Sequence, residues 1–600
     1  MKLAAFYIPQ GHLPNIFGDD HEEVTINLGG ENLYKFQSGQ LTTINPNPFY
    51  IEDILSKDIS LFSCIVGNNG GGKTTLIGAF GNAYYCKYVV EFEGGTYEIR
   101  DHIEDVHRIY YSPYLHHKTF SSVRNNFKDL SKFAMVINDN HGDGGHLAEF
   151  LQRHHSESIK RWISFNHFYS QEKFSKISLP VFHEVEVKLN HFDANIHKPE
   201  TFNDTSYQLR KAIGMLFNKM KSESEEKEID AGRGKNLRED QATRISFLIR
   251  FEYAVYDTFL GKLISILEQA GNKFLSEGFI DEDYEEQIGE RDVRNGLLWL
   301  LENSGVRRGE DIYNFSRHII GIELIDYILS ITDSESATDN WRIITIPEEQ
   351  VLKLIQLFDE FNQSFINDWF EYEKTPMFTF IPKVVASSGE QSFLNLFSTL
   401  YYHAQNIKNK VDVDFHSFDS LGMINDKIML LIDEGDNAFH PQWKKEFVRI
   451  LRKLVPKIFK GYKIQIIITS HDPLTLSDFP KNNVVFLDRS SGVTQIGNSS
   501  EKRTFGGNIS DLLKDSFFIN DGQIGGFASD MIDWLIDGIR KKNLSTSQIE
   551  RMERFINCID EPILKFKLAE MLSESLGESY FERKLLDEEI ARLNERRERL

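Results

Sequence analysis

An eight-residue run near the amino end of the chain has residue types that could hold a phosphate. It reads Gly67-Asn-Asn-Gly-Gly-Gly72-Lys73-Thr74 and lies between an apolar run and a helix-compatible stretch. Glycines at these spacings let backbone N–H groups and a helix start point at a phosphate, the lysine adds a positive charge, and the threonine hydroxyl can ligate Mg²⁺. We therefore predict a Walker A loop that binds ATP and Mg²⁺. The predicted nucleotide contacts are Gly67, Asn68, Asn69, Gly70, Gly71, Gly72, Lys73, Thr74 and Thr75.

Two further apolar runs end in polar residues of the kind that phosphoryl transfer needs. Ile428 to Ile432 is followed by Asp433 and Glu434, a Walker B arrangement in which Asp433 would join Thr74 as a Mg²⁺ ligand and Glu434 would orient or deprotonate the attacking water. Ile464 to Thr469 leads to His471, which we expect to hydrogen-bond the γ-phosphate. The predicted catalytic residues are Lys73, Glu434 and His471.

A third segment lies between the loop and the acidic pair. It reads Ser387-Ser388-Gly389-Glu390-Gln391 and follows a short apolar strand, before a helix-like stretch from Ser392 to His403. A helix start places N–H groups where they can meet a phosphate. An acidic pair, a lone histidine or a Ser-Ser-Gly turn is common by itself, so these segments gain meaning only from their order along the chain.

That order resembles the ABC ATPase class, in which Walker A, the signature, Walker B and a histidine follow one another. The run Asp433-Glu434-Gly-Asp436-Asn-Ala-Phe439-His440-Pro441-Gln-Trp443 is more closely similar to the Walker B and D-loop of prokaryotic AAA-domain, SMC-like soluble ATPases than to membrane transporters. The resemblance implies an α/β fold: an ABC-type P-loop ATPase head of sheet and helices.

The resemblance also implies a dimer with two ATP molecules sandwiched between heads. The residues that would contact ATP held by the other copy are Ser388, Gly389, Glu390 and Gln391. Two positions depart from the class: Glu390 replaces the second glycine of the transporter-type signature, and Ser112 stands where the Q-loop residue usually lies.

Residues 504–527, with an asparagine, glycines and paired aromatic residues, resemble the tail of ATPases from antiphage and restriction-linked operons, notably the Septu ATPase. This resemblance implies a separately encoded HNH-type nuclease as partner, and contact with nucleic acid through that complex. No nuclease motif is recognised in the chain itself. Two alternatives stay open: an SMC-like ATPase of DNA repair or DNA tethering, and a nucleotide-gated scaffold that barely turns over.

The distance between motifs predicts four parts. Residues 1–135 and 375–520 would form the ATPase head, residues 136–374 an α-helical insertion lobe, and residues 521–600 a helical tail for partner or dimer contact. Helical periodicity supports five helices in the lobe, over residues 207–221, 244–270, 292–303, 320–331 and 348–373. The charged stretch from Ser222 to Asp240 is interpreted as a mobile loop, because it is poor in apolar residues.

Composition and charge limit the surface character and the cellular compartment that we expect for this protein. A net charge of −22 over 600 residues argues against a surface that is basic throughout. Three scattered cysteines fit reduced thiols in a cytoplasmic protein, and no apolar run is long enough to span a membrane. The stripe Leu586, Ile590, Leu593 and Leu600 suggests a docking or capping helix. The histidines at 116, 117, 141, 146, 154 and 155 match no known ligand spacing, so we expect no metal site among them.

Overall fold

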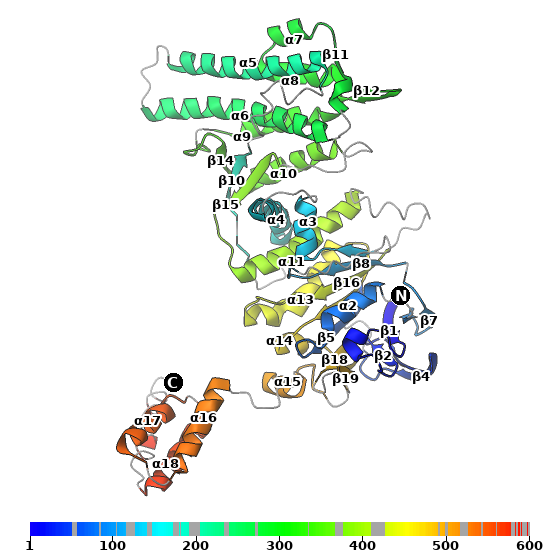
Figure 1. Cartoon of the computed structure of the whole chain (residues 1–600), viewed down its shortest axis with the longest axis vertical. Helices are drawn as coiled ribbons and strands as arrows, with labels where there is room; N and C mark the ends of the chain where they lie inside the picture. The colour runs from blue at the N-terminus through cyan, green and yellow to red at the C-terminus, as the bar shows by residue number, and fades with distance from the viewer. Residues whose placement is uncertain are drawn as a thin grey trace. The chain divides into compact units, whose positions relative to one another are not determined.

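The computed structural model divides into two compact units, Met1–Leu512 and Leu513–Leu600, which are described separately (Figure 1). The described residues are 1–50, 57–82, 86–103, 105–115, 127–140, 147–171, 179–180, 182–190, 205–232, 239–269, 274–333, 335–365, 376–409, 426–489, 493–497, 502–516, 526–541, 544–559, 561–577 and six positions between 583 and 597.

A seven-stranded sheet forms the centre of the first unit, in the order β19-β18-β5-β17-β16-β8-β9. All neighbouring strands pair in parallel except β18 and β19. The strands are β5 (Ile59–Gly67), β8 (His107–Tyr111), β9 (Phe127–Asp129), β16 (Lys427–Asp433), β17 (Lys463–Thr469), β18 (Val484–Asp488) and β19 (Gln495–Ile496). The mixed α/β fold with a parallel sheet fits the predicted P-loop class.

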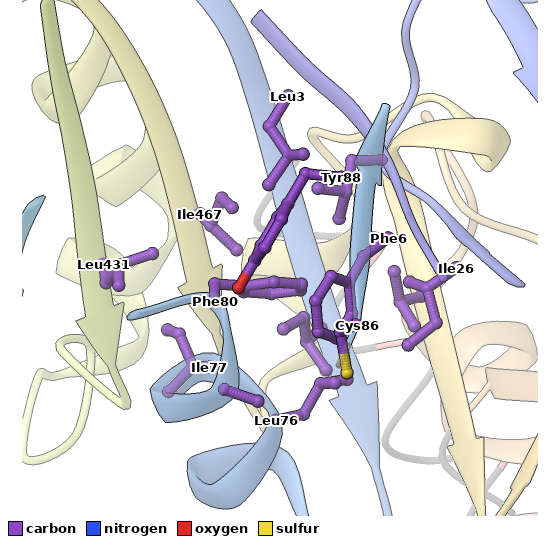
Figure 2. Packing of buried hydrophobic residues seen from close by; sticks show 14 of the residues in the cluster. Leu3, Phe6, Ile26, Leu76, Ile77, Phe80, Cys86, Tyr88, Leu431 and Ile467 are labelled. Atoms are coloured by element: carbon purple, nitrogen blue, oxygen red, sulfur yellow. The ribbon is translucent and has the colours of Figure 1, made fainter. Parts of the chain in front are cut away.

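One face of this sheet is covered by α2 (Lys73–Asn82) and by antiparallel strands from the start of the chain. Figure 2 shows side chains of α2, such as Phe80, between Phe6 and Tyr88 of the antiparallel sheet and Leu431 and Ile467 of the parallel one. The antiparallel sheet has the order β2-β1-β6-β7, and a hairpin of β3 and β4 accompanies it. These strands are β1 (Lys2–Ile8), β2 (Val24–Asn27), β3 (Asn32–Gln37), β4 (Gln40–Pro46), β6 (Lys87–Glu91) and β7 (Tyr97–Arg100).

Helices cover the other face of the parallel sheet. These are α11 (Ser388–Asn409) and α13 (Pro441–Ile458), and Phe62 of β5 meets Phe479 edge-on with ring centroids 5.0 Å apart. Because both faces are covered, β16 is apolar on both sides: residues 428–432 are all buried. The short elements α1 (Pro14–Phe17), α14 (Pro473–Leu476) and η5 (Lys481–Asn483) also belong to the first unit, and α15 (Ile509–Ser516) crosses its boundary at Leu512.

Residues 132–382 contain the five helices predicted from periodicity, but strands accompany them. β10 pairs antiparallel with β14 and β15, and β12 with β11 and β13, so this part is not purely helical. The helices are α3 (Lys132–Asn140), α4 (Leu147–Ser170), α5 (Tyr207–Gly232), α6 (Glu239–Gln269), η2 (Phe274–Glu277), α7 (Tyr284–Glu290), α8 (Val293–Glu302), η3 (Phe315–His318), α9 (Ile320–Ile331) and α10 (Glu348–Gln363). The strands are β10 (Glu184–Leu189), β11 (Gly278–Ile280), β12 (Ser304–Arg308), β13 (Asp311–Asn314), β14 (Ile343–Pro347) and β15 (Phe378–Pro382).

The interpretation of Ser222 to Asp240 as a loop is wrong for most of the stretch, because α5 continues to Gly232. Its charges have partners on α6: Lys227 bonds Glu252 at 3.0 Å, and Glu228 bonds Arg250 at 2.6 Å. Lys227 precedes Glu228 on α5, whereas the partner of Lys227, Glu252, follows Arg250 on α6. The two helices therefore lie antiparallel. Cross-helix pairing of this kind is invisible to a count of apolar residues. Residues 233–238 lie outside the described parts.

The second unit contains α16 (Gly526–Ile539), α17 (Thr546–Asn557) and α18 (Pro562–Leu576). A small core joins them, in which Leu535, Ile556 and Leu572 are buried. Ser545 and Gln548 form a capping box that starts α17. Leu586 and Ile590 of the predicted stripe are exposed, whereas Leu593 and Leu600 lie outside the described residues.

Cysteines are free thiols in this structure, and two of them are buried. Burial raises the pKa of Cys64 and raises that of Cys86 to about 12, so both side chains act as small apolar groups. Among the helices that the structure describes, none combines the length and the apolar character needed to cross a membrane.

Candidate nucleotide site

The predicted site residues meet at the carboxyl edge of the parallel sheet, where α/β sheets bind ligands. β17 lies between β5 and β16, and Thr469 pairs in register with Ile65 on one side and with Asp433 on the other. The strands β5, β17 and β16, which are far apart in the sequence, therefore end side by side. This brings the phosphate-loop pattern, the acidic pair and His471 together.

Backbone geometry explains the glycines of the loop. Gly70 and Gly72 have φ of 73° and 87°, in the left-handed region that disfavours side chains. A Cβ on Gly67 would also lie 2.3 Å from the Leu487 carbonyl oxygen of β18. The loop is held from outside as well, because Arg489 donates a hydrogen bond to the Gly70 carbonyl at 2.6 Å. The glycine spacing is thus needed for the backbone path.

Lys73 folds back over the loop. Its Nζ donates to the Gly67 and Asn68 carbonyls at 3.2 Å each, and the side chain is largely buried. Burial lowers the pKa of Lys73, and the carboxylates of Glu434 and Asp433 oppose that effect. The Lys73 ammonium group is therefore bonded to the loop and lies in the field of the Glu434 and Asp433 carboxylates.

Asp433 is buried and is surrounded by hydroxyl groups. Its Oδ2 accepts hydrogen bonds from Thr74 at 2.8 Å and Tyr110 at 3.3 Å, and its Oδ1 accepts one from Thr469 at 2.5 Å. A threonine hydroxyl beside a carboxylate is an all-oxygen donor set, which Mg²⁺ prefers. Thr74 and Asp433 therefore fit the predicted metal role, with Thr469 orienting the carboxylate.

Glu434 is held from two sides. Its Oε1 lies 2.8 Å from Nε2 of His471, and its Oε2 accepts a hydrogen bond of 2.6 Å from the Tyr114 hydroxyl. The bond from His471, supported by Tyr114 and opposed by burial, lowers the pKa of Glu434 to about 2. The backbone at Glu434 has φ of 49°, an unusual conformation for a non-glycine residue, and its N–H donates to Thr469 at 2.9 Å. The Glu434 carboxylate is therefore ionised and held in one orientation.

A second buried carboxylate connects the acidic loop to the histidine strand. Oδ2 of Asp436 accepts hydrogen bonds from Ser470 at 2.5 Å and from Thr475 at 2.7 Å. Burial raises the pKa of Asp436, and the two hydroxyl groups oppose that rise. These bonds fix the segment after Glu434 against the segment that carries His471.

The Ser387–Gln391 segment lies at the start of a helix, as predicted, but α11 begins at Ser388, four residues before the predicted helical stretch. Glu390 accepts a hydrogen bond from the Ser387 N–H at 2.7 Å and its own N–H bonds the Ser387 hydroxyl, a capping box. Gln391 donates to the Ala386 carbonyl at 2.8 Å, so the side chains of Glu390 and Gln391 bond local backbone. Ser388 remains exposed. The nucleotide contacts assigned to this segment stay predictions.

α11 is packed against α4 by aromatic rings. Phe168 stacks on Tyr401 with centroids 4.7 Å apart, and Trp162 donates a hydrogen bond of 2.9 Å to Asn395. Beneath this contact, Arg161 of α4 forms a buried ion pair with Asp139 of α3 at 2.9 Å. The signature segment is therefore supported by residues far away in the sequence.

Sequence reasoning missed several residues of the site, namely Tyr110, Tyr114, Thr469 and Arg489. The run Tyr110-Tyr-Ser-Pro-Tyr114 directly after a buried strand was the available signal for the tyrosines. Ser112, named as the candidate Q-loop residue, is buried and its Oγ accepts from the Tyr114 N–H at 3.4 Å. Tyr114 reaches the acidic pair from this turn.

The histidine cluster has a structural partner at one position. His154 bonds Asp139 at 2.7 Å, in the network with Arg161. The histidines at 116, 117, 141 and 146 lie outside the described residues. Over the described ranges, no group of three or more His, Cys, Asp or Glu residues is arranged to hold a metal ion.

Comparison with known proteins supports an AAA-type ATPase. The family model described as "AAA domain, putative AbiEii toxin, Type IV TA system" matches residues 189–477, which include the signature, Walker B and His471 but begin after the phosphate loop. The Septu protein PtuA of Bacillus mycoides (strain KBAB4) is 26% identical over 216 residues, 35% of this chain and 25% of that protein. The matched part thus spans a quarter of that relative. The chain resembles the AAA-type ATPases of this family and also the Septu protein PtuA.

Proposed function

We propose that the chain binds and hydrolyses ATP with Mg²⁺ in an ABC-type head, as an ATPase of antiphage defence in the cytoplasm. One observation carries this proposal. The phosphate loop, Asp433, Glu434 and His471 converge from three neighbouring strands, and Thr74 bonds Asp433 at 2.8 Å across 359 positions of sequence. A phosphate loop, an acidic pair and a histidine at the carboxyl edge of a parallel sheet are the groups that ATP hydrolysis requires.

Each group has a role that follows from its contacts. The loop N–H groups and Lys73 would hold the β- and γ-phosphates, and Thr74 and Asp433 would hold Mg²⁺. When bound, Mg²⁺ neutralises charge on the phosphate oxygens. Glu434 would accept a proton from the attacking water, since its carboxylate is ionised and oriented. His471, bonded to Glu434 at 2.8 Å, would stabilise the γ-phosphate and the position of the base.

ATP joins two copies of the chain in this proposal. The Walker A and Walker B residues are assembled within one chain, whereas Ser387 and Ser388 at the start of α11 are exposed. The preceding Val385 is 88% exposed. Exposed apolar and hydroxyl groups beside a helix start suit contact with ATP and the surface of a second head. Ser388, Gly389, Glu390 and Gln391 would supply that contact, in a homodimer or a higher oligomer.

The proposed organisation keeps four parts. Residues 1–135 and 375–520 form the head, residues 136–374 an insertion, and residues 521–600 a tail that contacts a partner or the second copy. The family match supports an AAA-type head, and the separate core of the second unit supports a distinct tail.

We assign the chain a separately encoded HNH-type nuclease as partner, controlled by nucleotide state, with nucleic acid bound through the complex. The similarity to Septu protein PtuA supports this assignment. The test is to purify the chain alone and after co-expression with the product of its neighbouring gene, and to measure ATP turnover and plasmid cleavage for both. Turnover without cleavage by the chain alone, and cleavage only with the neighbour, is the expected result. Cleavage by the chain alone, or no ATP binding, would overturn the proposal.

A further inference from the structure

Tyr114 lies on the turn that follows β8, and its side chain enters the nucleotide site. The turn is anchored by Ser112, which is buried and whose carbonyl accepts from the Lys132 N–H at 2.8 Å. The Tyr114 N–H is directed to the Ser112 hydroxyl at 3.4 Å, and Pro113 between them restricts the backbone. The tyrosine ring is therefore carried on a supported turn, and its hydroxyl meets Glu434 at 2.6 Å.

The Tyr114 hydroxyl has a defined direction of bonding. Tyr114 donates its single O–H to Oε2 of Glu434, so its oxygen is left to accept a hydrogen bond. The Nδ2 group of Asn437 donates to the same Tyr114 oxygen. The three residues form one directed chain of hydrogen bonds, from amide to phenol to carboxylate, in which each bond polarises the next.

The residues at the two ends of this series of hydrogen bonds, Asn437 and Glu434, differ in solvent exposure. Asn437 and Ala438 lie on an exposed loop, and the Ala438 carbonyl is 3.3 Å from the position of a Cβ on Gly389. Glu434 is half-buried between Tyr114 and His471. The hydrogen-bond chain therefore runs from a surface loop beside the signature segment to the carboxylate that would activate water.

We propose that Tyr114 is a positioning residue that holds the Glu434 carboxylate in its reactive orientation, and that Asn437 controls Glu434 through Tyr114. This inference rests on the proposed ATP hydrolysis and names a control on the same site. A second head that contacts the exposed loop at Asn437 would change the orientation of Glu434 through these two hydrogen bonds. No group of the second copy would need to touch Glu434.

The first test compares Tyr114→Phe with wild type in the full chain. Loss of the hydroxyl leaves one oxygen of Glu434 without this restraint, and small misplacement of a reacting group is costly, so we expect kcat to fall about 10-fold. The Kd of ATP, measured by direct binding, should not change, because the hydroxyl that is removed bonds Glu434 and Asn437. Tyr462→Phe, before the amino end of β17, is the matched control and should match wild type.

The second test asks whether Asn437 acts through Tyr114. Asn437→Ala should lower kcat about threefold, the worth of one ordinary hydrogen bond. The double variant Tyr114→Phe, Asn437→Ala should be no slower than Tyr114→Phe alone. If the losses in kcat of the two single variants multiply in the double variant, the two residues act separately. That result would overturn the proposal that Asn437 acts through Tyr114.

The outcomes separate this inference from the proposed function. A wild-type chain that hydrolyses no ATP refutes the proposed function, and the hydrogen bond is then still tested by urea unfolding of Tyr114→Phe, Glu434→Ala and their combination. We expect the changes in the urea midpoint of the two single variants not to add up in the double variant. Changes that add up would overturn the inference. If wild type hydrolyses ATP and Tyr114→Phe equals Tyr462→Phe in kcat, Tyr114 has no positioning role even though the proposed function stands.

Discussion

The two parts of the candidate site are built in different ways. The Walker side, formed by Lys73, Thr74, Asp433, Glu434 and His471, is joined by hydrogen bonds between strands that are distant in sequence. The signature side, residues 387–391, bonds its polar side chains to its own backbone and is supported from behind by packing of α11 on α4. The first side is preorganised within one chain, whereas the second leaves Ser388 exposed.

The sharpest test of the Walker side is Glu434→Gln. The amide keeps the shape of the side chain but cannot accept a proton, so we expect turnover at least ~10²-fold slower with ATP binding retained. Steady-state hydrolysis and equilibrium ATP binding measure the two quantities. Glu310→Gln, on an exposed turn, is the control. Unchanged turnover in Glu434→Gln would remove Glu434 from the role of base.

The support behind the signature side is tested by Asp139→Asn. Burial alone would raise the pKa of Asp139, but Arg161 and His154 together lower it to about 2. Loss of the carboxylate leaves a buried guanidinium without its anion, which should reduce the free energy of unfolding by about 3 kcal/mol at pH 7. Urea unfolding measures this, with the exposed Asp311→Asn as control.

The same pair predicts a pH dependence with a definite sign. Because the pKa of Asp139 is lower in the folded chain than its ordinary value of 3.8, its stabilisation is present above about pH 4 and is lost as the pH falls towards 2. The difference between wild type and Asp139→Asn should therefore shrink over this range. A constant difference down to pH 2 would contradict the assigned ion pair.

Ser388→Arg tests the exposed side directly. A bulky cation at the start of α11 should weaken ATP-dependent association at least about 10-fold by steric and charge mismatch, while ATP binding to the Walker side of a single chain is retained. Light scattering with and without ATP, with the exposed Ser330→Arg as control, gives the answer. Dimers of Ser388→Arg that persist with ATP would place the contact elsewhere.

The smallest effect is expected from Glu390→Ala. It opens the capping box with Ser387 and should lower the free energy of unfolding by about 0.5–1 kcal/mol. Glu390→Gln retains an acceptor for the Ser387 N–H and should stay close to wild type. If both variants match wild type in stability but lose ATP-dependent association, Glu390 contacts the nucleotide or the second copy instead of acting as a cap.

Local patterns in the sequence determined much of this protein. The glycines from Gly67 to Gly72 predicted the loop because their spacing is a backbone requirement, and the run of residues 428–432 predicted a strand covered on both faces. Five helices of the middle region followed from apolar periodicity, because one face of each packs on a core. These properties depend on neighbours within a few positions.

Only the tertiary structure decided which distant residues meet. Tyr114 reaches Glu434, Thr469 binds Asp433, and the charges of α5 pair with those of α6, each through a contact that no local pattern contains. The strands β10 and β14 escaped prediction for the same reason, since their pairing joins segments well apart in the chain. Residue types determine what a segment can do, whereas side-chain partners across the fold are selected by sheet register and helix packing.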